Sequence, residues 1–135
     1  MAKLTEDQVI NFLCTWLKNK GWKKLEMSTS YSRGLDLKVC KGRKVMIVEA
    51  KGSKANPKAY NKVRDKFDSG QINDHFGKAI VKVLEQRHQH PGWTVAIAQP
   101  NDSYIREHLQ DATPEMSRIG IRLFWVESRK EVLTE

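Results

Sequence analysis

Apolar residues near the N-terminus recur at helical spacing. Phe12, Leu13 and Trp16 are three and four residues apart along the chain, as on one face of an amphipathic helix. Thr5 is a suitable N-cap before this stretch, and Gly21 is a suitable stop after it. The pattern therefore predicts a helix between Thr5 and Gly21.

Three short apolar or alternating segments follow and predict strands. They cover residues 22–27, 35–40 and 44–50. The short turn Lys41-Gly42-Arg43 separates the last two, so the three segments predict an antiparallel meander. Residues 52–69 are polar and lysine-rich, which favours a loop, with a short helix over residues 60–67 as an addition to it.

Helical spacing returns over residues 71–89 and is followed by further elements. The pattern predicts strands at 93–98 and 121–126, a helix at 103–109, and a short helix or turn at 114–118. The order α-β-β-β-α-β-α-β is typical of an α/β protein with a central mixed β-sheet flanked by helices. A chain of 135 residues with 39% apolar content suits one core, so we expect a single domain over 1–135, with a core at about 5–126 and a polar tail at 127–135.

No part of the sequence resembles a membrane or export signal. No apolar run approaches the roughly 18 residues of a membrane-spanning helix, and the first residues lack a signal-peptide pattern. We therefore expect a cytoplasmic protein with no membrane partner.

Positive charge is concentrated in one part of the chain. The net charge is +8, but residues 18–66 carry fifteen Lys and Arg against four Asp and Glu, a balance of +11, while the remainder sums to −3. A local basic field binds polyanions through phosphate contacts and counterion release. The alternative is that the lysines serve solubility, but evenly scattered lysines would fit that alternative better.

Asp36, Glu49 and Lys51 are placed at the ends of two predicted strands that form a hairpin. If Lys41 and Gly42 form a two-residue loop, Asp36 lies opposite Ile47, diagonal to Glu49 and on the same face. A four-residue loop places Asp36 directly opposite Glu49. A three-residue loop without a bulge places the two carboxylates on opposite faces and excludes a shared site.

These residue types suit phosphodiester chemistry. Two carboxylates offer the oxygen ligands that Mg²⁺ prefers, and the backbone carbonyl of Ala50 could complete the coordination. Such a metal activates a water and neutralises charge on the transition state, while Lys51 could hold the water or stabilise the developing charge. Acid-x-Lys triplets occur twice in this composition, at Asp36 and at Glu49, so the weight comes from the strand context; the alternative is a solvated ion pair at a strand end.

Together these features resemble the PD-(D/E)XK nuclease superfamily, the restriction-endonuclease-like fold. The resemblance covers roughly residues 5–126 and rests on the Asp36 hairpin, the Glu49-Ala50-Lys51 signature and the helices on either side. It implies Mg²⁺-dependent hydrolysis by a metal-activated water, with DNA as the usual substrate. Asp36 and Glu49 would bind the metal and Lys51 would be the catalytic lysine. Leu35 stands where the family has a proline.

The resemblance also suggests weaker candidates. Glu6, in the first turn of the first helix, either helps to arrange the metal or compensates the helix dipole. Gln71 resembles an accessory glutamine that opens the following helix, although His75 stands where an aromatic residue is expected; simple solvent exposure is the alternative. For DNA contacts the candidates are Tyr31, Arg33, Lys54, Lys58 and Lys62.

The sequence thus predicts a small DNA-associated endonuclease that uses Mg²⁺, with Mn²⁺ able to substitute. The alternative is a catalytically silent DNA-binding or assembly module with the same fold. DNA is the expected partner, and cutting of both strands would suggest a homodimer.

Overall fold

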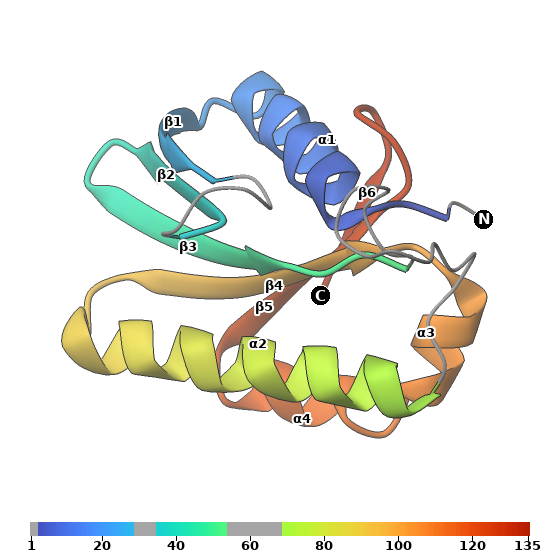
Figure 1. Cartoon of the computed structure of the whole chain (residues 1–135). Coiled ribbons are helices and arrows are strands. Elements are labelled where there is room, and N and C mark those ends of the chain that lie inside the picture. Colours follow the sequence, from blue (N-terminus) through green and yellow to red (C-terminus); the bar gives the residue numbers. More distant parts are fainter. Residues whose placement is uncertain (1–2, 29–34, 54–68) are drawn as a thin grey trace.

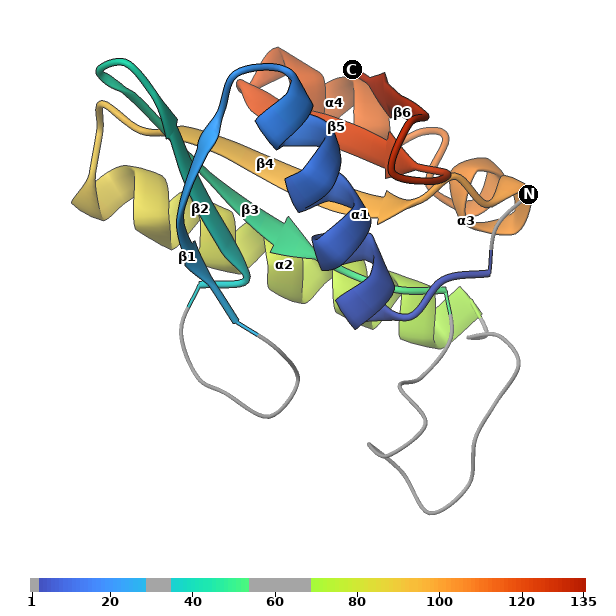
Figure 2. The same ribbon diagram turned by 90° about the horizontal axis from the view of Figure 1, so that it is seen from above.

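The protein folds around a six-stranded mixed β-sheet with helices on both faces (Figures 1 and 2). The computed structural model describes residues 3–28, 35–53 and 69–135. The strands are β1 (Lys23–Met27), β2 (Leu37–Lys41), β3 (Lys44–Ala50), β4 (Thr94–Pro100), β5 (Ile121–Val126) and β6 (Val132–Thr134). They lie in the sheet in this order: β3, β4 and β5 run parallel, and the pairings of β1 with β2, β2 with β3, and β5 with β6 are antiparallel.

Two apolar cores separate the sheet from the helices. Helix α1 (Glu6–Asn19) covers one face, and α2 (Ser69–Gln89), α3 (Ser103–His108) and α4 (Thr113–Arg118) cover the other (Figure 1). Strand alternation divides the side chains of β3 between these cores, because Met46 and Val48 pack toward α1 while Ile47 packs toward α2. Glu49 and Lys51 continue the alternation from Ile47, so this parity directs them toward α2.

The predicted first helix is confirmed, and its start is fixed by a capping box. The Thr5 side chain accepts a hydrogen bond from the Gln8 amide, and the Gln8 side chain accepts one from the Thr5 amide. This places Glu6 in the first helical turn, next to the end of β3.

The hairpin turn lies one residue later than in the two-residue loop considered above, which shifts the pairing of β2 with β3 by two positions and keeps the expected parity. Lys41 pairs with Lys44, so the turn residues are Gly42 and Arg43 rather than Lys41 and Gly42. Gly42 has a φ of +61°, and the tight turn with glycine at its first central position requires this conformation. Continued by one position beyond Leu37 and Val48, the observed register places Asp36 opposite Glu49, as expected for the longer loop.

The predicted fold class is confirmed: the chain is a single-domain α/β protein with a mixed sheet flanked by helices. The predicted order of elements is present with two additions, namely α4 as a regular helix and β6. Strand β6 lies within residues 127–135, where we expected a polar tail, and pairs with β5 through its backbone. Because this strand is only three residues long, alternation of apolar residues could not identify it.

Within the described residues, no helix is both long enough and apolar enough to span a membrane.

Candidate active site

The carboxyl groups of Asp36 and Glu49 meet at the end of β3. Both side chains are buried, with 8% and 5% of the residue surface exposed, and they are linked by a side-chain hydrogen bond. The backbone amide of Ala50 donates a hydrogen bond of 2.9 Å to Oδ2 of Asp36. The first acid is therefore held against the strand that carries the second acid.

Lys51 adds a positive charge to this pair. Its Nζ lies 3.8 Å from Oε1 of Glu49, and only 16% of its side chain is exposed. The amide of Lys51 donates to the carbonyl of Ala98 at 2.9 Å, which extends the β3–β4 pairing past Ala50 and fixes the direction of the lysine. The structure thus brings together the three residues that the sequence singled out.

The start of α1 is held against the chain that leaves the site. Ser53 donates its amide to the carbonyl of Leu4 at 2.7 Å, and its side chain accepts from the amide of Leu4 at 2.9 Å. Gly52 makes this approach possible, because a Cβ there would lie 2.5 Å from the backbone nitrogen of Glu6. Glu6 is therefore brought into the electrostatic field of Asp36 and Lys51.

Burial raises the pKa of two acids at this site, Glu49 and Glu6. Desolvation, together with the negative charge of Asp36, raises the pKa of Glu49 from 4.5 to about 8, although Lys82 and Lys51 act in the opposite direction. Desolvation, again with Asp36, raises the pKa of Glu6 to about 7. Two buried carboxyl groups in contact are costly to ionise together, so a bound cation would relieve a repulsion that the fold creates.

The arrangement suits Mg²⁺ better than a metal that requires a full set of protein ligands. Among the residues that the structure describes, no group of three or more His, Cys, Asp and Glu is placed to hold a metal ion. Mg²⁺ commonly binds through one or two carboxylates and keeps several waters, or takes oxygens from a substrate phosphate. Asp36 and Glu49 fit this ligand number, and the carboxyl group of Glu6 lies close enough to interact electrostatically with Asp36.

Lys82 of α2 is a part of the site that our reading of the sequence missed. Its Nζ lies 3.4 Å from both carboxylate oxygens of Glu49, from the helix that covers this face of the sheet. A weak signal exists in the sequence, since Gln71, His75, Lys78 and Lys82 recur at helical spacing as a polar stripe. Nothing in that spacing shows which strand the stripe faces.

Gln99 was also missed. It is 3% exposed at the end of β4, and one further step along the β3–β4 register places it beside Lys51. Alternation from Ile97, which packs toward α2, gives Gln99 the same facing as Glu49. A buried amide at this point adds hydrogen-bonding capacity to the carboxyl ends of the parallel strands.

The remaining candidates are less directly connected to the carboxylates. Gln71 lies in the first turn of α2 and is partly exposed. Burial and the nearby charges of Lys51 and Lys78 lower the pKa of His75, which places His75 near the site. The candidate DNA-contacting residues lie outside the described residues, as does the predicted helix at 60–67: Tyr31, Arg33, Lys54, Lys58 and Lys62.

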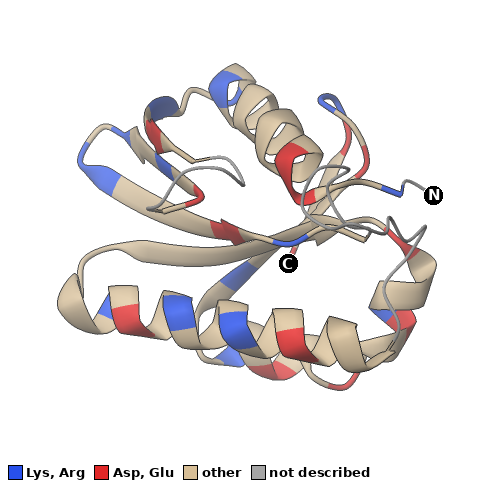
Figure 3. Cartoon of the chain, viewed as in Figure 1, with Lys and Arg blue, Asp and Glu red and all other residues tan. Residues whose placement is uncertain are grey.

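Lysines and arginines are distributed over both faces of the described structure. Figure 3 shows them on the hairpin of β2 and β3, on α1 and along α2, where acidic positions are interspersed. Some of the basic residues pack on aromatic rings, as Lys38 does on Trp93 at 4.5 Å. Of the fifteen Lys and Arg of residues 18–66, nine lie within the described ranges.

The fold and the site define an α/β protein with a buried pair of acids and a lysine at the carboxyl end of a sheet strand. No model of a known protein family matches the sequence, and a search of curated proteins found no match.

Two solved structures share the fold. An XisH family protein from Nostoc punctiforme superposes with a TM-score of 0.60 at 13% identity, covering 94% of this chain and 97% of that one. An fdxN element excision controlling factor protein from Anabaena variabilis gives a TM-score of 0.63 at 16% identity, covering 94% and 96%. At these identities the likeness concerns the fold, which the three proteins share over nearly their whole lengths.

Proposed function

We propose that this protein is a Mg²⁺-dependent DNA endonuclease. The observation that carries the proposal is the buried contact between Asp36 and Glu49, with the ammonium group of Lys51 3.8 Å from Glu49. A solvated ion pair at a strand end would not require two carboxyl groups to be buried against each other. Burial of like charges is typical of a site that binds a cation or transfers a proton.

Each residue has a role that follows from its position. Asp36, Glu49 and the carbonyl of Ala50 would hold the cation, and the Ala50 amide orients Asp36 through Oδ2. When bound, Mg²⁺ or Mn²⁺ would lower the pKa of a coordinated water and neutralise charge on the transition state. Lys51 holds the attacking water or stabilises the developing negative charge, and Glu6 supports the arrangement from α1.

DNA is the proposed substrate because of charge and of the resemblance. The +11 balance of residues 18–66 surrounds the site in sequence and favours a polyanion. The PD-(D/E)XK signature at Glu49-Ala50-Lys51 is associated with DNA cleavage by the same type of metal site. Tyr31 and Arg33 before Asp36, and Lys54, Lys58 and Lys62 after Lys51, are the proposed DNA contacts.

A second candidate is a catalytically silent DNA-binding or assembly module with the same fold. One observation favours it: a structural neighbour is named an excision controlling factor, which describes control and not cleavage. The nuclease remains the first candidate, since a silent module would not need Asp36, Glu49 and Lys51 to be held together.

A substrate panel separates the two candidates. The purified protein is incubated with supercoiled, linear, branched and single-stranded DNA, in Mg²⁺ or Mn²⁺ and in EDTA. The endonuclease proposal expects new DNA ends on at least one substrate in the presence of the metal and none in EDTA. Tight binding without cleavage on every substrate would instead support the silent module.

A further inference from the structure

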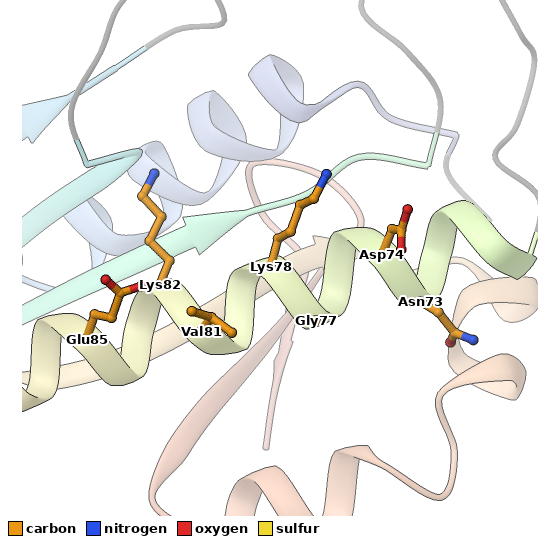
Figure 4. A pocket seen from close by; sticks show the side chains of 7 residues that line it. All are labelled: Asn73, Asp74, Gly77, Lys78, Val81, Lys82 and Glu85. Atoms are coloured by element: carbon orange, nitrogen blue, oxygen red, sulfur yellow. The ribbon is translucent and has the colours of Figure 1, made fainter.

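Two lysines on α2 border the proposed active site. Lys78 and Lys82 are four residues apart, so they project from the same side of the helix. Figure 4 shows both side chains rising from α2 on the side that faces β3. The contact of Lys82 with Glu49 at 3.4 Å shows that this side of α2 lies directly across from the carboxylates.

A hollow opens to solvent along this helix. It has a volume of about 480 Å³ and is lined by Asn73, Asp74, Gly77, Lys78, Val81, Lys82 and Glu85 (Figure 4). All seven lining residues belong to α2, so the hollow is an open surface that suits contact with part of a large ligand and not the enclosure of a small one. A Cβ at Gly77 would meet no atom within 4 Å, so the helix backbone is open to an approaching group at this point.

Positive charges converge where the hollow meets the site. Lys51 and Lys78 both act on His75, so their ammonium groups lie near the first half of α2. Lys82 lies one turn beyond Lys78 and contacts Glu49. Among the described residues no carboxylate forms an ion pair with Lys78, whereas Lys82 is paired with Glu49 and remains 44% exposed. Asp74 and Glu85 also line the hollow, one turn before Lys78 and one turn after Lys82, and their negative charges oppose an anion at its two ends. An anion is therefore favoured only beside the two lysines.

We infer that Lys78 and Lys82, together with the open backbone at Gly77, form a phosphate-binding wall that holds the DNA strand against the Asp36, Glu49 and Lys51 site. A cation bound at the carboxylates would take the place of Lys82 beside Glu49, and the long flexible side chain of Lys82 would then be free to contact a DNA phosphate. The inference rests on the proposed function for its ligand, but it concerns binding and not the hydrolytic step.

The test measures DNA binding without hydrolysis. Fluorescence anisotropy of a labelled DNA duplex in EDTA, over a series of salt concentrations, compares wild type with Lys78→Gln and Gly77→Leu. Lys78→Gln removes one phosphate contact, so affinity falls several-fold and the slope of log K against log salt decreases by about 1. Gly77→Leu fills the hollow but changes no charge. We therefore expect the affinity for DNA to fall, while the slope of log K against log salt reports the phosphate contacts that remain.

Matched controls exclude general effects of charge and folding. Lys130→Gln makes the same charge change in the β5–β6 connection, and we expect it to leave the affinity nearly unchanged. Thermal unfolding of each variant shows that the fold is intact. Lys82→Gln is measured separately, because this substitution also removes the positive charge that lies beside Glu49.

The outcomes separate this wall from the nuclease proposal. Unchanged affinity and salt slope in both Lys78→Gln and Gly77→Leu would overturn the wall while leaving metal-dependent cleavage intact. Failure of wild type to bind DNA in EDTA would also overturn it. If binding depends on Lys78 and Gly77 as expected but no substrate is cleaved in Mg²⁺, the wall is supported and the endonuclease proposal fails.

Discussion

Glu49 combines more of the properties of the site than any other described residue. Its carboxyl group contacts Asp36, lies 3.8 Å from the Nζ of Lys51 and 3.4 Å from the Nζ of Lys82, and is buried. Burial and the neighbouring acid together favour a proton on this group, while the two lysines favour the charged form. The protonation of Glu49 therefore links the free energy of unfolding to the affinity of the site for a cation.

The raised pKa of Glu49 predicts a pH dependence of stability. The pKa of Glu49 is about 8 in the folded state against an ordinary value of 4.5, so between these values the folded state holds a proton that the unfolded state has lost. The free energy of unfolding must then decrease as pH rises from about 4.5 to about 8. Glu49→Gln removes this titration, so we expect a flatter dependence and a higher midpoint than wild type at pH 8.

Thermal or urea unfolding in EDTA across this pH range provides the measurement. Glu85→Gln is a suitable control because Glu85 is exposed on α2. Parallel pH profiles for wild type and Glu49→Gln would contradict the proposed burial of an ionisable Glu49.

Gly52 predicts a steric effect at the same end of β3. A Cβ added there would lie 2.5 Å from the nitrogen of Glu6 and 2.8 Å from the carbonyl carbon of Thr5, both backbone atoms that cannot turn away. We expect Gly52→Ala to lower the free energy of unfolding by about 1–3 kcal/mol, as overpacking does elsewhere. Gly92→Ala is the control, since a Cβ at Gly92 meets nothing within 4 Å. Equal stability of the two variants would contradict the close approach of α1 to residues 52–53.

At this scale the sequence predicts the members of the site that lie on the hairpin, but not those that come from other elements. Asp36, Glu49 and Lys51 could be placed on one face by alternation and by hairpin pairing alone. Lys82 and Gln99 reach the same place through the packing of α2 on the sheet and the parallel pairing of β4. The helical or strand periodicity of the sequence predicts neither of these two contacts between distant elements.

Among the elements, the first hairpin shows how a local detail changes the register. Glycine at the first central position moves the turn to Gly42 and Arg43, and each residue of β2 thereby pairs two positions further along β3 than we expected. Because the shift is even, the facing of Asp36 relative to Glu49 is unchanged. The conclusion about the site survived because it depended on parity and not on the register itself.

The limits of the long elements were predicted closely, and the short ones less so. Strands β3 and β5 have the predicted bounds, and α2 begins two residues earlier than its apolar spacing indicated. Strand β6 was missed because three residues give no measurable alternation, and it is held by backbone pairing with β5.

Helix α2 carries a glycine in its middle, which predicts a stabilising substitution. Gly77 lies within a 21-residue helix, and nothing within 4 Å would contact an added Cβ. We expect Gly77→Ala to raise the free energy of unfolding by about 0.5–1 kcal/mol, because alanine loses less backbone freedom on folding. Gly120→Ala should have the opposite effect, since Gly120 has a φ of +84°. A loss of stability in Gly77→Ala would show that the helix surface is occupied at this point.

At the scale of the whole molecule, the proposed active site lies at one end of the sheet, where β3 and β4 end. Two cores, one on each face, are joined by parallel strands whose carboxyl ends carry Glu49, Lys51 and Gln99. Ligand sites of α/β sheets commonly lie outside the carboxyl ends of the strands. The two structural neighbours show that the same architecture occurs in proteins of almost the same length with very different sequences.

A single proposed site per chain has a consequence for the products. One site cuts one strand at a time, whereas a two-fold dimer presents two sites to a duplex. The homodimer remains a prediction, and the ratio of nicked to linear plasmid products at early times distinguishes the two cases.

Cleavage of supercoiled DNA by wild type and by single variants of the site tests the central claim most directly. In Mg²⁺ or Mn²⁺ we expect wild type to convert the plasmid to nicked or linear forms. Glu49→Ala and Lys51→Ala should cleave roughly 100-fold more slowly or less, yet still bind DNA. Glu115→Ala and Lys130→Ala, both at exposed positions outside the site, should behave as wild type. Cleavage that persists unchanged in Glu49→Ala, or DNA binding by wild type without cleavage in either metal, would contradict the account.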